Sequence, residues 1–171
     1  MIFLLDDGSR VPAHRVIITH HSEYFARLLE GHYAEASQGE VTVHDISKEA
    51  FLCVLHHLYS CTPDSCKETK VLLEDDADVA VETSARAGQF LLPRLQDAVS
   101  DIIVIHHLSP SRAVELYAHG RLHGCGKLCD MCVLYLLCCY DVGEAGYRDL
   151  ARCDYAVDVY KEIREVIMKA L

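Results

Sequence analysis

No long apolar run occurs in the sequence, and this absence limits where the chain can act. A helix that crosses a bilayer needs roughly 18 or more consecutive apolar residues, and no segment approaches that length. The apolar start from Met1 to Leu5 is followed at once by Asp6 and Asp7, and no basic residue precedes it. A secretory signal needs a basic start and a longer apolar core. We therefore expect an intracellular chain, in the cytoplasm, the nucleus or both.

Positive charge is scarce as well. The chain has 16 Lys and Arg residues against 26 Asp and Glu residues, which gives a formal net charge of −10. A surface of this charge is repelled by the phosphates of nucleic acids and by anionic membranes. The composition therefore predicts neither a nucleic-acid partner nor a membrane partner.

Motifs of the common enzyme classes are missing too. The sequence contains no G-x-S-x-G nucleophile motif, no phosphate-binding loop and no G-x-G-x-x-G fingerprint. Six of the eleven histidines form adjacent pairs, at 20–21, 56–57 and 106–107. Adjacent residues diverge by about 100° around a helix, so the two members of a pair cannot hold one ligand together. We therefore expect no enzyme, no catalytic residue and no cofactor.

Cysteine, by contrast, is abundant, with nine residues in the chain. In a reducing compartment so many cysteines are more typical of buried thiols than of a disulfide framework. The metal-like group in the sequence comprises Cys125, Cys129 and Cys132, with His123 just before them. Zinc needs about four converging ligands, and no second pair stands at zinc-finger spacing. We interpret the three cysteines as buried thiols and expect no metal, and the alternative is a zinc or thiol sensor.

The first sixty residues alternate between short apolar segments and turn or cap residues. Asp7-Gly8 stands between two apolar runs and predicts a hairpin, because glycine readily adopts the positive φ of a tight turn. Ser22 and Ser47 are expected to be N-caps, since a serine hydroxyl can accept a free backbone N–H at the start of a helix. The predicted elements are strands over 2–5, 9–13 and 40–46, a helix over 15–20, and helices that begin at Ser22 and Ser47.

The rest of the chain is predicted to be almost wholly helical. Val71-Leu72-Leu73 could form one more short strand, and the acidic run Glu74-Asp75-Asp76 is expected to be a solvated helix start, where the helix dipole favours negative charge. Ser109-Pro110 matches an N-cap followed by proline at the first helical position. The predicted helices cover 77–90, 93–107, 110–119, 127–140 and the segment from about 154 to the C-terminus.

This order of elements predicts an α+β fold with a small sheet and a helical extension. So few strands cannot bury both faces of a sheet, so helices must cover one side of it. An apolar fraction of 51% over 171 residues can supply the core of one domain with such an extension.

The first sixty residues resemble a BTB/POZ domain. The resemblance is carried by Pro12-Ala13-His14-Arg15 after the hairpin, by Ser22-Glu23-Tyr24-Phe25 at the second helix, and by Val43-His44-Asp45-Ile46-Ser47 before a helix that ends in Leu58-Tyr59-Ser60. Residues 76–107 resemble the last two helices of the domain, and the helices from Leu108 are similar to the BACK-type extension of cullin-3 adaptors. The resemblance implies a BTB/POZ domain over 1–107 and an all-α BACK-like extension over 108–171. The chain is also similar to the BTB-containing C-terminal part of armadillo-repeat proteins.

What the family implies is protein–protein interaction without catalysis. The resemblance implies a homodimer that is formed by the first strand and first helices, with Ile2, Phe3, Val16, Ile17 and Tyr24 at the interface. In cullin-3 adaptors the loop after the second helix carries an apolar residue, any residue, then glutamate, and Tyr33-Ala34-Glu35 has that pattern here. The implied role is that of a ubiquitin-ligase adaptor that brings a client protein to cullin-3. The alternative is an oligomerisation or scaffold module of a transcriptional or structural protein that does not bind cullin.

The residue types at this loop suit such a contact. A tyrosine ring can fill an apolar pocket at little entropic cost while its hydroxyl reaches a polar rim. A carboxylate two residues later can pair with a basic group and fix the register of the complex. His14, in the Pro-Ala-His-Arg segment of the family, is expected to be a partly buried histidine with its hydrogen bonds satisfied.

Overall fold

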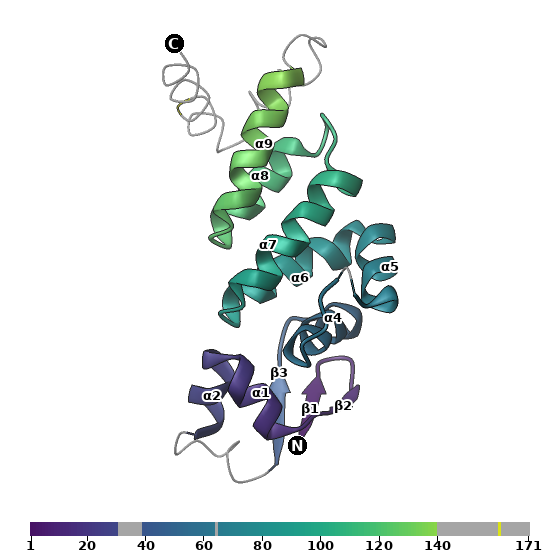
Figure 1. Cartoon of the computed structure of the whole chain (residues 1–171), viewed down its shortest axis with the longest axis vertical. Coiled ribbons are helices and arrows are strands. Elements are labelled where there is room, and N and C mark those ends of the chain that lie inside the picture. The colour runs from purple at the N-terminus through teal and green to yellow at the C-terminus, as the bar shows by residue number, and fades with distance from the viewer. Residues whose placement is uncertain (31–38, 64, 140–160, 162–171) are drawn as a thin grey trace.

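The computed structural model describes residues 1–30, 39–63, 65–139 and 161 of the chain. The small sheet lies at one end of the molecule, and the helices follow one another towards the other end (Figure 1). None of the helices in the described ranges is both long enough and apolar enough to cross a membrane.

The sheet is built from strands β1 (Ile2–Leu5), β2 (Arg10–Pro12) and β3 (Glu40–Val43) in the order β2-β1-β3. β1 pairs antiparallel with β2 and parallel with β3, so that Phe3 lies opposite both Val11 and Val41. The predicted hairpin is confirmed: Gly8 has a φ of +83° and its N–H donates to the carbonyl of Leu5 at 2.9 Å. β3 ends at Val43, earlier than predicted, because Asp45 has a φ of +57° that breaks the extended backbone.

Helices α1 (Arg15–His21), α2 (Glu23–Glu30) and α4 (Lys48–Leu58) lie next to this sheet (Figure 1). Both predicted serine caps are confirmed. Ser22 Oγ accepts from the N–H of Phe25 at 3.3 Å and donates to the carbonyl of Phe90 at 2.9 Å. Ser47 Oγ accepts from the N–H of Ala50 at 3.2 Å. Each cap therefore satisfies a backbone group that the first turn of its helix leaves open.

The segment around Val71 is helical, so the strand suggested there by the sequence is wrong. Helix α5 (Lys67–Asp75) buries Thr69 and Leu73, which are four residues apart on one face, and leaves Val71 exposed. The acidic run spans the junction between α5 and α6 (Ala77–Gln89) instead of starting one helix. Only Asp76 begins a helix there: its carboxylate accepts from the N–H groups of Asp78 and Val79 and caps α6.

The helical half of the chain follows the prediction with shifted ends. Helix α7 (Pro93–Ile102) continues into the π-helical segment η1 (Ile103–His107), which together fill the predicted range 93–107. Helix α8 (Ala113–Leu122) begins three residues later than predicted, because the residues after Ser109 form a turn. Helix α9 (Gly126–Cys139) matches its prediction closely, whereas the helix predicted from about 154 lies outside the described residues except for 161.

One apolar core connects the sheet with the last helices. At the sheet end, the ring of Phe3 packs edge-on against Phe25 and Phe51, with centroids 5.5 Å and 5.0 Å apart. The same cluster of buried side chains continues through Leu95 to Leu128 in α9. The α+β fold class predicted from the sequence is therefore confirmed.

Candidate functional site

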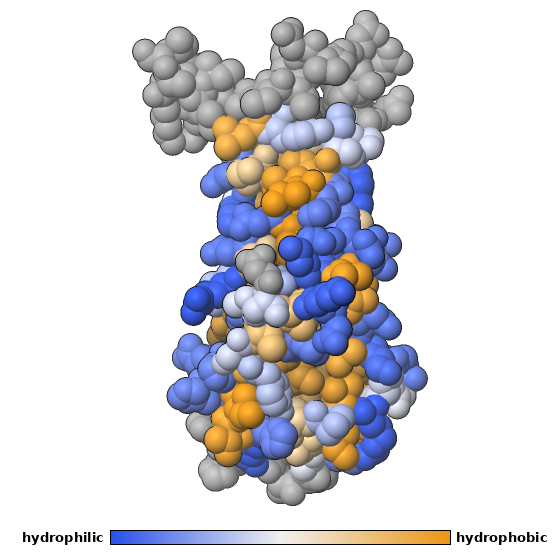
Figure 2. Space-filling model, turned by 45° about the vertical axis from the view of Figure 1, so that its right-hand side comes forward, coloured by the Kyte–Doolittle hydropathy of each residue, from blue (hydrophilic) through white to orange (hydrophobic). Residues whose placement is uncertain are grey.

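Helix α1 directs its apolar side chains both inward and outward. Ile18 is completely buried, whereas Val16 is 80% exposed and Ile17 is half-buried. Exposed apolar patches lie among hydrophilic side chains on the face of the molecule that Figure 2 shows. One face of α1 thus anchors the helix in the core through Ile18, while Val16 is exposed and Ile17 half-buried at the surface.

The other residues predicted for a dimer interface lie in different surroundings. Ile2 is half-buried, and Tyr24 is half-buried beside the rings of Phe25 and Phe90, with centroids 5.1 Å and 5.2 Å away. Phe3 is completely buried in the core of its own chain, so its ring is not part of the chain's surface. The dimer interface stays a prediction. Phe3 can contribute to it only indirectly, by packing beneath the residues that lie at the surface.

The tripeptide Tyr33-Ala34-Glu35 lies outside the described residues, between α2 and β3. A pocket of about 180 Å³ lies where α2, β3 and the end of α6 meet. Half-buried Tyr24 and Leu28 line it together with Arg86, whose guanidinium donates to the carbonyl of Asp45. The arrangement combines apolar walls with a cation, which suits an apolar side chain that carries a polar end.

His14 is exposed instead of partly buried, which corrects the expectation for this residue. Its hydrogen bonds are nevertheless satisfied. The Tyr59 hydroxyl lies 2.7 Å from His14 Nδ1 and accepts from the His14 backbone N–H at 2.8 Å. Because His14 precedes α1 and Tyr59 follows α4, this contact fixes α1 relative to α4 and helps to orient the exposed face of α1.

Cys125, Cys129 and Cys132 are buried between the last helices, as predicted. Cys125 Sγ lies 3.0 Å from the buried Ser100 hydroxyl. Burial, together with the smaller effects of Cys129 and Cys125, raises the pKa of the Cys132 thiol to about 12. A thiol with such a raised pKa is a poor nucleophile at neutral pH.

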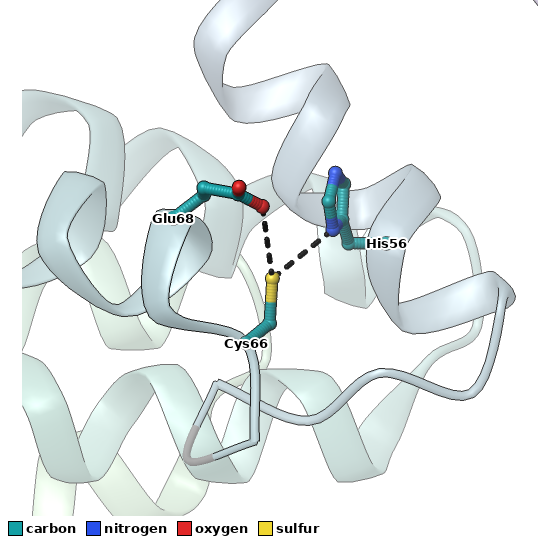
Figure 3. A group of neighbouring side chains, drawn as sticks. All are labelled: His56, Cys66 and Glu68. Atoms are coloured by element: carbon teal, nitrogen blue, oxygen red, sulfur yellow. Dashed lines mark hydrogen bonds between the residues drawn. The ribbon is translucent and has the colours of Figure 1, made fainter.

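A different group of ligand-type side chains meets between α4 and α5 (Figure 3). His56 comes from the last turn of α4, Cys66 directly precedes α5, and Glu68 lies in the first turn of α5. Cys66 Sγ points between the other two, 3.2 Å from His56 Nδ1 and 3.8 Å from Glu68 Oε2. Within the described ranges, this is the one such trio whose ligand atoms all lie within 4.8 Å of one another.

The spacing of these three residues in the sequence does not predict that they meet. In the sequence, His56 stands out only as half of an adjacent histidine pair, and no motif includes Cys66. Cys66 follows His56 by ten positions and lies outside α4, so neither helical nor strand periodicity relates the two residues. The sequence signal for this group is a histidine followed, after a short connection, by a Cys-x-Glu tripeptide. This signal is weak, because the sequence does not show that the connection brings the tripeptide back to the histidine.

Comparison with known proteins identifies the fold family. The family model of the BTB/POZ domain matches residues 1–104. The chain is 33% identical to armadillo repeat-containing protein 5 of Mus musculus over 141 residues, which are 79% of this chain and 15% of that protein. It is 28% identical to BTB/POZ domain-containing protein 9 of Drosophila melanogaster over 134 residues, 78% of this chain and 17% of that protein.

A shorter match relates the chain to Rho-related BTB domain-containing protein 3 of Homo sapiens, with 40% identity over 68 residues, 39% of this chain and 11% of that protein. The chain thus spans less than a fifth of the length of each of these three relatives. BTB/POZ domains are protein–protein interaction modules that commonly mediate dimerisation and partner binding, and the family match indicates no catalytic family. With its strands and helices in the order that the resemblance implies and the family model matched over residues 1–104, the chain belongs to the BTB/POZ domain family.

Proposed function

We propose that this chain is an adaptor that forms a BTB-type homodimer, binds cullin-3 and positions a client protein for ubiquitination. Membership of the BTB/POZ family carries the proposal. In this proposal residues 108–171 act as a BACK-like extension, and the chain works in the cytoplasm, the nucleus or both. The ligase carries out the chemical step, and the adaptor positions the client protein for it.

The exposed face of α1 supports the dimer. Val16 is 80% exposed on a helix whose orientation is fixed from within by Ile18 and at its start by the contact between His14 and Tyr59. A preorganised apolar side chain loses little conformational entropy when a partner covers it. Half-buried Ile17 would extend the covered area.

The cullin-3 contact is assigned to Tyr33, Ala34 and Glu35. A tyrosine in the middle of an interface can contribute 2 kcal/mol or more, which corresponds to about 30-fold in affinity. We therefore expect the double variant Tyr33→Ala/Glu35→Lys to bind purified cullin-3 at least about 30-fold more weakly than the wild type in a calorimetric titration. Asp130→Lys, an equal change of sign at an exposed residue of α9, is the matched control and should bind like the wild type.

The dimer has its own test. Val16→Asp places a charge on the proposed interface and should shift sedimentation velocity from dimer towards monomer. Leu122→Asp, at a residue that is 72% exposed in α8 and outside the proposed interface, also replaces an exposed apolar side chain by aspartate and should leave the dimer intact. Equal binding of cullin-3 by the folded double variant would refute the assigned loop. A stable dimer that does not bind cullin-3 would instead favour the alternative function, an oligomerisation or scaffold module.

A further inference from the structure

The group of His56, Cys66 and Glu68 has the spacing of a zinc site. In tetrahedral coordination with Zn–S of about 2.3 Å and Zn–N or Zn–O of about 2.1 Å, the sulfur lies about 3.6 Å from each of the other ligand atoms. The observed separations from Cys66 Sγ, 3.2 Å to His56 Nδ1 and 3.8 Å to Glu68 Oε2, lie on either side of that value. Small rotations of two side chains would therefore bring all three atoms to one ion.

The donors also match the ion. Thiolate, imidazole and carboxylate are the three ligand types that zinc uses in proteins, whereas calcium and magnesium take oxygen ligands. Glu68 is exposed and His56 is half-buried, so an ion can reach the group from solvent. Cys66 is buried, so its sulfur is held on the inner side of the group.

Backbone hydrogen bonds at the end of α4 and just before α5 restrain the chain at His56 and Cys66. The N–H of Cys61 donates to the carbonyl of His56 at 3.0 Å, and the N–H of Cys66 donates to the carbonyl of Thr62 at 3.0 Å. Behind the sulfur, the hydroxyl of Thr69 lies 3.2 Å from Cys66 Sγ and donates to it. Thr69 is only 4% exposed, so it can orient the sulfur and stabilise its thiolate form from the interior.

We propose that His56 Nδ1, Cys66 Sγ and the carboxylate of Glu68 bind one Zn²⁺ ion, with water in the fourth position. On binding, the Cys66 thiol releases its proton to solvent and no electron is transferred, since zinc has no redox chemistry here. The ion would join the end of α4 to the start of α5. This site goes beyond the proposed adaptor role and does not depend on it.

The first test uses the whole purified chain, reduced and freed of metal. Titration with Co²⁺, a spectroscopic substitute for Zn²⁺, should give a thiolate-to-cobalt charge-transfer band that saturates at one ion per chain and is displaced by Zn²⁺. Cys66→Ser should abolish this band. Cys61→Ser, in the same connection but outside the trio, is the matched control and should keep it.

Affinity measured by competition with a chromophoric zinc chelator completes the test. Glu68→Gln changes an exposed ligand, leaves the core intact and should weaken Zn²⁺ binding. Thr69→Val keeps the buried shape but removes the hydroxyl behind the sulfur, and it should weaken binding by about 10–100-fold. Zn²⁺ should also raise the melting temperature of the wild type but not that of Cys66→Ser. The proposal is overturned if the wild type shows no charge-transfer band, or if the wild type and the folded Glu68→Gln variant bind Zn²⁺ equally.

Discussion

Acidification is expected to weaken the packing of α8 on α6 through one histidine. The ring of His119 in α8 lies 4.5 Å from that of His123, measured between centroids. Burial, together with the smaller effect of His123, lowers the pKa of His119 to about 4, although a backbone hydrogen bond with Val81 of α6 acts in the opposite direction. His119 Nε2 is buried and has no hydrogen-bond partner among the described residues. Protonation would therefore place an uncompensated charge between the helices.

Whether acid stabilises or destabilises the fold depends on which state, folded or unfolded, takes up the proton of His119 at the higher pH. The ordinary pKa of 6.5 applies to the unfolded chain, whereas the folded chain takes up this proton only near pH 4. As pH falls through this window, the unfolded state binds more protons, so the free energy of unfolding decreases. Between about pH 7 and about pH 5 the two pKa values give a loss of about 2 kcal/mol. Partial exposure of the ring to solvent reduces this to about 1 kcal/mol.

The assay is urea unfolding of the wild type and His119→Gln at both pH values. Glutamine cannot titrate, so the variant should lose about 1 kcal/mol less stability than the wild type on acidification. Burial also lowers the pKa of His57 and of His123, but these residues remain in both proteins, so the difference isolates His119. His20→Gln, at an exposed residue of α1, should follow the wild type. Identical losses in the wild type and His119→Gln would refute the argument.

Two further predictions concern the last helices. A Cβ on Gly120 would lie 2.8 Å from the sulfur of Cys129, so Gly120→Ala should lower the free energy of unfolding by about 1–3 kcal/mol in urea titration. Gly126→Ala, where a Cβ meets nothing within 4 Å, is its control and should be neutral or slightly stabilising. Cys132, with its pKa raised to about 12, should resist iodoacetamide in the folded protein at neutral pH, while the more exposed Cys61 reacts; labelling of both at one rate would contradict the assigned burial.

Sequence reasoning succeeded where structure depends on neighbouring residues. Asp7-Gly8 predicts its hairpin because the turn needs a residue that tolerates positive φ, and Gly8 adopts it. Ser22 and Ser47 predict helix starts because their hydroxyls reach backbone N–H groups three residues ahead. The hairpin turn and the helix caps each depend on residues at most three positions apart, so the local sequence is enough to predict them.

The error at α5 has a different origin. Val71-Leu72-Leu73 is an apolar run that begins with a β-branched residue, which locally favours a strand. In the structure only Leu73 of the three is fully buried, and the residue that shares its face is the polar Thr69. The apolar pattern of a helix was therefore not visible in the sequence, because one of the two buried positions of α5 is occupied by a threonine and not by an apolar residue. That threonine is buried next to a sulfur with which it forms a hydrogen bond, a contact that no local pattern contains.

The start of α5 links this error to the proposed zinc site. Cys66 occupies the N-cap of α5, yet its side chain makes no capping hydrogen bond, and cysteine is not among the preferred caps. Serine is a preferred cap, and Ser65 stands one position earlier, where its hydroxyl bonds with Thr62. A serine at position 66 would favour the helix by about 1 kcal/mol. Because helix formation alone gives no reason for a cysteine here, the contacts of its sulfur with His56, Glu68 and Thr69 supply the reason that the local sequence lacks.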